Sequence, residues 1–218
     1  MITIFIIALT ALISYLAFNN SSYMNKLIFY PPAVKRGGWY RLVTYGVLHA
    51  DFTHLIFNML TLYIFGSYIE KFFRAILGDQ AGGFWYIIMY ISALIISILP
   101  TYLKEKNNDN YRGLGASGAV SAVVFAYILI NPMSFMGVMF VPVMLPAFLF
   151  GILFVVLSVV LQKKHSGGIN HSAHIAGGIF GMVFIVILFA LLADINIIRH
   201  FADQIQISSI SDLIHIGY

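Results

Sequence analysis

The sequence predicts an all-α membrane protein, a bundle of six transmembrane helices. Hydrophobic residues make up 61% of the chain and charged residues only 9%, whereas a soluble domain carries about 25% charged residues. A membrane-spanning helix needs about 20 mostly apolar residues, and six stretches of the chain approach that length. The few polar residues inside these stretches gather near one end of them, which indicates a site.

The six predicted helices follow one another with polar or proline-containing connections between them. They cover Ile2 to Phe18, Phe52 to Ile69, Phe84 to Leu103, Gly115 to Ile130, Ala147 to Leu161 and Ser172 to Ala193. The first run has no basic residues before it and no small-residue cleavage pattern after it, so we expect a retained helix rather than a signal peptide.

The connections predict a structured loop, a surface segment and a tail. Residues 19–51 contain Trp39 with a Pro-Pro and a Gly-Gly pair, a mixture that suits a structured loop at the membrane interface. Residues 131–146 are apolar but interrupted by prolines, so we expect them at the membrane surface. We therefore expect one six-helix domain over residues 1–195 and a short polar tail over residues 196–218.

Polar side chains interrupt the second, fourth and sixth helices. These three helices cross the membrane in the same direction, so their first turns lie near the same membrane face. The intruding residues all fall within about two turns of the helix start: His54, Asn58, Ser117, Ser121, His171 and His174. Ionisable groups inside a membrane are costly and usually functional, so their common depth predicts a functional site.

Small residues predict that the fourth and sixth helices touch beside this site. They recur near the start of both helices: Gly115, Gly118, Ala122, Gly177 and Gly181. Small residues four apart let two membrane helices approach closely. If these two faces meet, Ser117 and His174 lie at the same end of the contact.

The polar residues supply the groups that acyl transfer requires. A serine is a weak nucleophile until an adjacent base takes its proton, and His174 is the candidate base for Ser117. The oxyanion of the intermediate needs preplaced hydrogen-bond donors, which His54, Asn58 and the Ser117 N–H can provide. No Asp or Glu lies in the apolar stretches near that face, so the pattern indicates a Ser-His dyad without a carboxylate.

Other interpretations compete at each position. The GASG stretch alone is typical of helix packing, and Ala119 breaks the G-x-S-x-G pattern of soluble hydrolases. His54 and Asn58 could form an interhelical hydrogen-bond pair. His171 and His174 could bind a metal, but no nearby carboxylate or cysteine completes a ligand set. The chain has no cysteine, which excludes thiol catalysis and cysteine-ligated metals, and no basic stripe that would indicate a nucleic acid partner. We expect no metal, and nothing in the sequence implies a cofactor.

Three segments resemble the rhomboid intramembrane serine proteases, in that family's order. They read "WYRLVTYGVLHADFTHLIFNML", "GASGA" and "AHIAGGIFG". The resemblance implies a six-helix bundle whose site opens to water below the membrane surface. It also implies Ser117 as nucleophile and His174 as general base and acid, with His54, Asn58 and the Ser117 amide as the oxyanion hole. Arg41 and Glu70 match family positions that look structural.

Two positions depart from the family pattern. Four residues after the serine, family members often carry an aromatic residue that stacks on the catalytic histidine, and here that position is Ser121. His174 must therefore be held differently. The family's loop arginine usually follows its tryptophan directly, whereas Tyr40 intervenes here.

The resemblance predicts a serine endopeptidase that cleaves transmembrane segments of membrane proteins within the lipid bilayer. One alternative is a catalytically inactive relative that binds membrane-protein clients, although the intact Ser117 and His174 disfavour it. Another is a transporter with a histidine proton relay, which the absence of membrane carboxylates disfavours. The sequence leaves the oligomeric state open.

The charge distribution and the family resemblance predict opposite orientations. The site's face carries nine basic residues and the other face three: Lys26, Lys35, Arg36, Arg41, Lys104, Lys106, Arg112, Lys163 and Lys164, against Lys71, Arg74 and Arg199. The positive-inside rule would turn the site toward the cytoplasm. Long structured loops obey that rule poorly, so we follow the family and expect a bacterial inner-membrane protein with the site facing outward.

Overall fold

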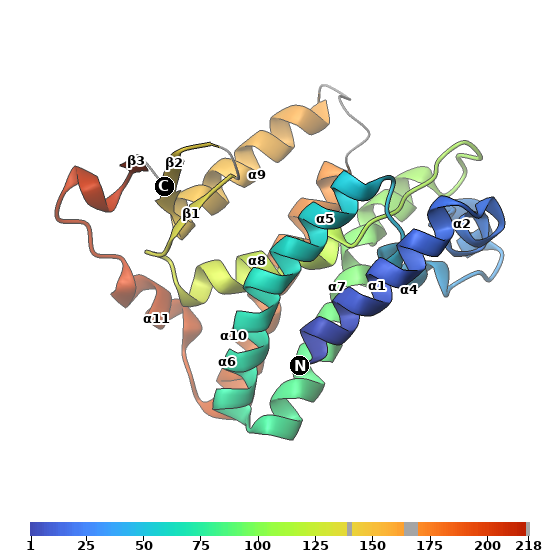
Figure 1. Ribbon diagram of the computed structural model, residues 1–218. Coiled ribbons are helices and arrows are strands. Elements are labelled where there is room, and N and C mark those ends of the chain that lie inside the picture. The colour runs from blue at the N-terminus through green and yellow to red at the C-terminus, as the bar shows by residue number, and fades with distance from the viewer. Residues whose placement is uncertain (139–140, 164–169, 217–218) are drawn as a thin grey trace.

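The computed structural model describes residues 1–138, 141–163 and 170–216 (Figure 1). Its helices are α1 (Ile2–Phe18), α2 (Ser21–Leu27), α3 (Pro31–Lys35), α4 (Arg41–Thr44), η1 (Tyr45–Val47), α5 (Phe52–Thr61), η2 (Leu62–Gly66), α6 (Ser67–Leu77), α7 (Asp79–Glu105), α8 (Ser117–Ile130), α9 (Ala147–Lys163), α10 (His171–Ala193), α11 (Ile197–Gln204) and η3 (Ile210–Asp212). Its strands are β1 (Phe135–Gly137), β2 (Val143–Pro146) and β3 (His215–Ile216).

The predicted all-α membrane bundle is confirmed, and each predicted apolar run is helical, except that the fourth helix begins at Ser117 rather than Gly115. Gly115 has φ of +113°, which no helix residue adopts. Within the part of the chain that the structure describes, three helices are long and apolar enough to span a membrane, namely Phe52–Leu77, Asp79–Glu105 and His171–Ala193. Three shorter apolar helices accompany them, namely Ile2–Phe18, Ser117–Ile130 and Ala147–Gln162. The count of six spans stays a prediction.

The second predicted helix is longer than its apolar run because its charged end is paired. It continues from α5 through the π-helical turn η2 into α6. The fully buried Glu70 in α6 accepts hydrogen bonds from the Ile2 and Thr3 N–H groups, both at 2.8 Å, and from Arg74 Nε at 3.0 Å. A carboxylate suits a helix N-terminus, where free N–H groups and the helix dipole favour negative charge. Glu70 thus joins α6 to the start of α1.

The loop over residues 19–51 contains four short helices, α2, α3, α4 and η1. Arg41 Nη1 donates to the carbonyls of Asn25 and Ile28, at 2.9 and 2.7 Å. Phe29 and Gly113 exchange two backbone hydrogen bonds, of 2.9 and 3.0 Å. This bridge links the loop to the segment that leads into Ser117.

The opposite end of the bundle carries a small antiparallel sheet that sequence patterns did not indicate. β1 pairs with β2, and β2 with β3, in the order β1-β2-β3. The strands have two to four residues, too short for a visible alternation of polar and apolar residues. The tail returns to the bundle at α11, where Gln204 Nε2 donates to the Ile130 carbonyl at the end of α8, at 2.8 Å.

The core lies where α10 packs between α8 and α7, with α6 beside α7. Its largest fully buried side chains include Tyr86, Phe73 and Phe189. Figure 1 shows α9 at the edge of the bundle, and much of its apolar surface is exposed, including Ile152 and Val156. An apolar exposed face of this kind suits lipid contact.

Candidate active site

The structure brings Ser117 and His174 together from two helices. Ser117 is the first residue of α8, and His174 lies in the first turn of α10. The Ser117 Oγ atom lies 2.7 Å from His174 Nε2, a hydrogen-bond distance, and both side chains are half-buried. This is the contact that a serine needs if the histidine is to take its proton.

The backbone before Ser117 has a shape that requires glycine. Gly115 has φ of +113°, in the left-handed region that favours glycine. A Cβ placed on it would lie 2.8 Å from His54 Cε1 and 4.0 Å from Ser117 Oγ. Its N–H donates to the Tyr45 carbonyl at 3.0 Å. Gly115 therefore lets the turn into α8 pass directly over the His54 ring.

Close contact between α8 and α10 sets the serine against the histidine. A Cβ on Gly177 would overlap the Gly118 carbonyl, and one on Gly181 would overlap the Ala122 carbonyl. The predicted small-residue faces thus meet in the structure, and side chains larger than hydrogen at these two positions would separate the helices. Both helices start at this end of the contact, so their first turns share one depth.

His54 and Asn58 lie one turn apart on α5, and the His54 ring lies against Gly115, in the turn before Ser117. The Ala50 N–H donates to His54 Nδ1 at 3.4 Å, which favours the neutral ring with its proton on Nε2. Asn58 is buried and its Nδ2 donates to the His54 carbonyl at 3.0 Å. That bond uses one of the two amide hydrogens, so one N–H of Asn58 is left for another acceptor.

Asn170 is a site residue that sequence patterns did not single out. Its Oδ1 accepts from the Ala173 N–H at 3.1 Å and so caps α10. Its Nδ2 donates to Thr101 Oγ1 at 2.8 Å and to the Tyr111 hydroxyl at 3.2 Å. The cap therefore fixes the first turn of α10 against α7 and the loop before α8. It went unnoticed because Asn170 precedes the apolar run.

His49 is a second residue that the sequence patterns missed. It is fully buried, and its ring lies edge-on to His54, with centroids 4.9 Å apart. The Ser14 hydroxyl donates to the Val47 carbonyl at 2.8 Å, so His49 Nδ1, 3.0 Å away, must donate to Ser14 Oγ. Burial and the nearby His54 lower the pKa of His49 to about 4, against the opposing effect of Asp51. His49 is thus a neutral support for the loop that enters α5.

The remaining predicted residues lie outside this cluster. His171 is buried, with its ring edge-on to that of His174 and centroids 6.0 Å apart. Arg41 holds the first loop and Glu70 the start of α1, as described above. Within residues 1–138, 141–163 and 170–216, no three His, Cys, Asp or Glu side chains gather as a metal site would require.

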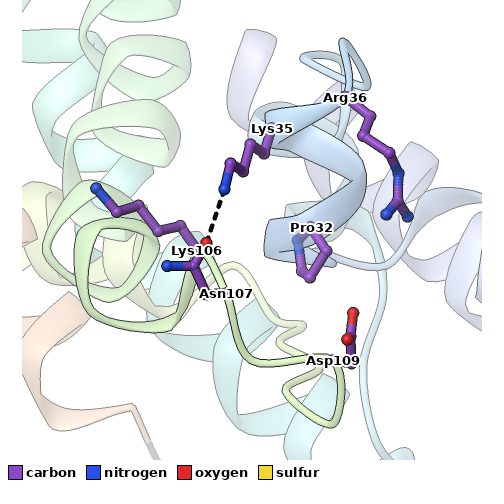
Figure 2. A pocket seen from close by; sticks show the side chains of 6 residues that line it. All are labelled: Pro32, Lys35, Arg36, Lys106, Asn107 and Asp109. Atoms are coloured by element: carbon purple, nitrogen blue, oxygen red, sulfur yellow. Dashed lines mark hydrogen bonds between the residues drawn. The ribbon is translucent and has the colours of Figure 1, made fainter.

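A separate polar hollow of about 420 Å³ opens between α3 and the end of α7 (Figure 2). Its lining residues are Pro32, Lys35, Arg36, Lys106, Asn107 and Asp109. Lys35 Nζ donates to Asn107 Oδ1 across it, at 2.8 Å. None of the predicted catalytic or oxyanion residues lines this hollow.

Comparison with known proteins gives one consistent family. A family model described as the Rhomboid domain matches residues 36–191. "RHOMBOID-like protein 12, mitochondrial" of Arabidopsis thaliana is 29% identical over 170 residues, which cover 73% of this chain and 49% of that protein. "Putative rhomboid protease YdcA" of Bacillus subtilis (strain 168) is 32% identical over 99 residues, 45% of each chain.

A third relative, "Rhomboid protease AarA" of Providencia stuartii, is 31% identical over 101 residues, 43% of this chain and 34% of that protein. The matched part of the chain thus spans half or less of the length of these relatives. The family model itself covers the residues from the first loop to the last turn of α10.

Proposed function

The chain belongs to the rhomboid family, and on that premise we propose that it is an intramembrane serine endopeptidase. The observation that carries the proposal is the 2.7 Å contact between Ser117 Oγ and His174 Nε2 inside an integral membrane protein. A serine and a histidine in contact at the shared end of two packed helices are the minimum needed for acyl transfer.

In the proposed reaction, Ser117 Oγ attacks the carbonyl carbon of the scissile peptide bond while His174 Nε2 takes its proton. The tetrahedral intermediate collapses, and His174 returns that proton to the departing amine, which leaves an ester on Ser117. Water then attacks the ester, with His174 again accepting a proton and passing it back to Ser117 Oγ. The other product is the peptide carboxylate.

Three donors are assigned to the oxyanion in this proposal. The Ser117 N–H belongs to the first turn of α8, where backbone N–H groups have no partner within the helix. His54 Nε2–H lies next to Gly115 in the turn before the serine. Asn58 has its second amide N–H available. Donors already fixed before reaction stabilise developing charge without reorganisation.

The proposed substrates are membrane proteins cut within or next to a transmembrane segment. A helical backbone hides its carbonyls in hydrogen bonds, so a substrate must unwind locally before Ser117 can reach one. Helix-breaking residues such as Gly near the cleaved bond should therefore speed cleavage. We place the protein in a bacterial inner membrane with the site opening outward, following the family resemblance.

The test is cleavage of a single-span substrate by the purified protein in liposomes. One substrate carries Gly-Ser at the centre of its span, and its matched partner carries Leu-Ala there. We expect wild type to cut the Gly-Ser version faster and Ser117→Ala to cut neither. Cleavage by Ser117→Ala at the wild-type rate would overturn the assigned nucleophile, and equal rates on both substrates would overturn the unwinding requirement.

A folded wild type that binds the substrate without cleaving it would instead identify an inactive client-binding relative.

A further inference from the structure

His174 lacks the partner that usually orients a catalytic imidazole. Among the residues that the structure describes, Ser117 is the one hydrogen-bond partner of the His174 ring. The position one turn after Ser117, where an aromatic ring could support the imidazole, is occupied by the small, buried Ser121. An imidazole that is free to rotate about χ2 would aim Nε2 at Ser117 only part of the time.

An aromatic ring does pack against His174, but it comes from α9 rather than from the serine's own helix, α8. Phe154, on α9, stacks on His174 with ring centroids 6.0 Å apart and an interplanar angle of 30°. This ring approaches from the edge of the bundle rather than from the serine's own helix. Stacking of this kind stabilises aromatic pairs beyond the burial of their area.

The Phe154 ring packs in turn against a second phenylalanine. Phe125, on α8, meets its ring edge-on with centroids 5.8 Å apart. Gly178, on α10, leaves the space for Phe125, because a Cβ there would lie 2.9 Å from Phe125 Cδ2. The contacts among His174, Phe154 and Phe125 therefore join α10, α9 and α8.

We propose that Phe154 is the positioning residue for His174, acting from α9 in place of an aromatic residue on α8. Phe154 acts through the histidine and does not touch the reacting atoms. This inference rests on the proposed function, because it assigns a role within the same reaction. It implies that α9, the edge helix, takes part in catalysis through the orientation of the base.

Four variants separate positioning from packing. Phe154→Leu removes the ring but keeps an apolar side chain, and Phe154→Tyr keeps the ring. Phe150→Leu is the matched control, because Phe150 lies one turn earlier on α9 and packs in the same small apolar cluster. Ser117→Ala gives the reference without the serine hydroxyl.

The first readout is kinetic, on the cleavable transmembrane substrate. We expect Phe154→Leu to lose about 2- to 13-fold in kcat, with KM nearly unchanged. This is the fold-change that corresponds to a stacking contribution of about 0.5–1.5 kcal/mol, at about 1.36 kcal/mol per tenfold. Phe154→Tyr should keep at least about half of the wild-type kcat. Equal kcat values for Phe154→Leu and Phe150→Leu would overturn the proposal.

The second readout does not depend on activity, so failure of the proposed function can be told apart from failure of this inference. In protein labelled with ¹⁵N-histidine, the His174 signal is identified by its loss in His174→Gln, and its Nε2 shift reports the hydrogen bond from Ser117. We expect Phe154→Leu to move that shift toward the Ser117→Ala value and Phe150→Leu to leave it at the wild-type value. An unchanged shift in Phe154→Leu would overturn the role of Phe154 even in an inactive protein.

Discussion

At the residue scale, the candidate site depends on positions where only one size of side chain fits. Gly115 combines a φ of +113° with a Cβ position 2.8 Å from the His54 ring. Gly37 has a similar φ of +101° but open space around its Cβ position. A substitution at Gly37 therefore measures the cost of backbone strain alone, whereas one at Gly115 adds a collision with His54.

We expect Gly115→Ala to lower stability by about 2–4 kcal/mol and to abolish Ser117 reactivity, because strain and collision act together. Gly37→Ala should cost only about 1 kcal/mol through strain and leave the serine reactive. Thermal unfolding in detergent and serine labelling measure the two effects. Equal behaviour of the two variants would show that His54 does not lie against Gly115.

His49 predicts a pH dependence of stability. Its pKa in the folded protein, about 4, lies below the ordinary value of 6.5, so the unfolded chain binds a proton more readily. Stability from His49 is therefore full above pH 6.5 and is lost as the pH falls toward 4, by up to about 3 kcal/mol. Unfolding midpoints measured between pH 7.5 and 4 should fall accordingly.

His49→Asn serves as the control for this titration, since an amide can donate to Ser14 without titrating. It should unfold at a lower midpoint than wild type at pH 7.5 but lose less stability on acidification. A wild-type midpoint as flat with pH as that of His49→Asn would contradict the buried neutral histidine.

Single residues could be predicted from the sequence where a polar side chain interrupts an apolar run. Ser117, His174, His54 and Asn58 stood out as polar groups in apolar runs, and the structure places the first three in one cluster. Their chemical roles stay predictions. Phe154 could not be found this way, because a phenylalanine inside an apolar run is ordinary and the chain has 19 of them.

At the element scale, the contact between α8 and α10 positions the site. A glycine-to-alanine change within a helix usually raises the free energy of unfolding by up to about 1 kcal/mol. A decrease instead indicates that the added methyl group collides with the neighbouring helix. At Gly181 the added methyl group would overlap the Ala122 carbonyl. At Gly151, on α9, its one close neighbour would be the flexible end of Ile128, at 3.0 Å, and the next atoms of Ile128 and Phe125 would lie at 3.7 Å, an ordinary contact distance.

We therefore expect Gly181→Ala to lower the unfolding midpoint, with a loss of about 1–3 kcal/mol from overpacking. Gly151→Ala should leave the midpoint unchanged or raise it. Thermal unfolding of both variants in the same detergent makes the comparison. A stabilised Gly181→Ala would mean that α8 and α10 are not in backbone contact.

The ends of elements were less predictable than their existence. The apolar run of the second helix ends at Ile69, but pairing of Glu70 with Arg74 and with the start of α1 extends the helix to Leu77. Such pairing depends on a segment far away in sequence. The strands of the small sheet also pair with the distant tail, through Met144 and His215, which no local pattern reveals.

At the scale of the whole molecule, the open question from sequence is which way the site faces. The chain has no cysteine, so single cysteines can report on each side. Asn110 is exposed in the loop that leads to α8, and Gln80 is exposed at the turn between α6 and α7, at the other end of the bundle.

In intact cells of a bacterial host, we expect a membrane-impermeant maleimide to label Asn110→Cys and not Gln80→Cys. Both should be labelled once the membrane is permeabilised. The reverse pattern in intact cells would show that the basic loops determine the orientation, as the positive-inside rule predicts.

A fluorophosphonate probe, applied to the purified protein in detergent, shows whether the serine at the start of α8 is activated. Ser121→Ala removes a buried serine one turn away on the same helix and serves as the matched control. We predict labelling of wild type and of Ser121→Ala, and none of Ser117→Ala or His174→Ala. Labelling of Ser117→Ala as strong as that of wild type would show that the reactive serine is not Ser117.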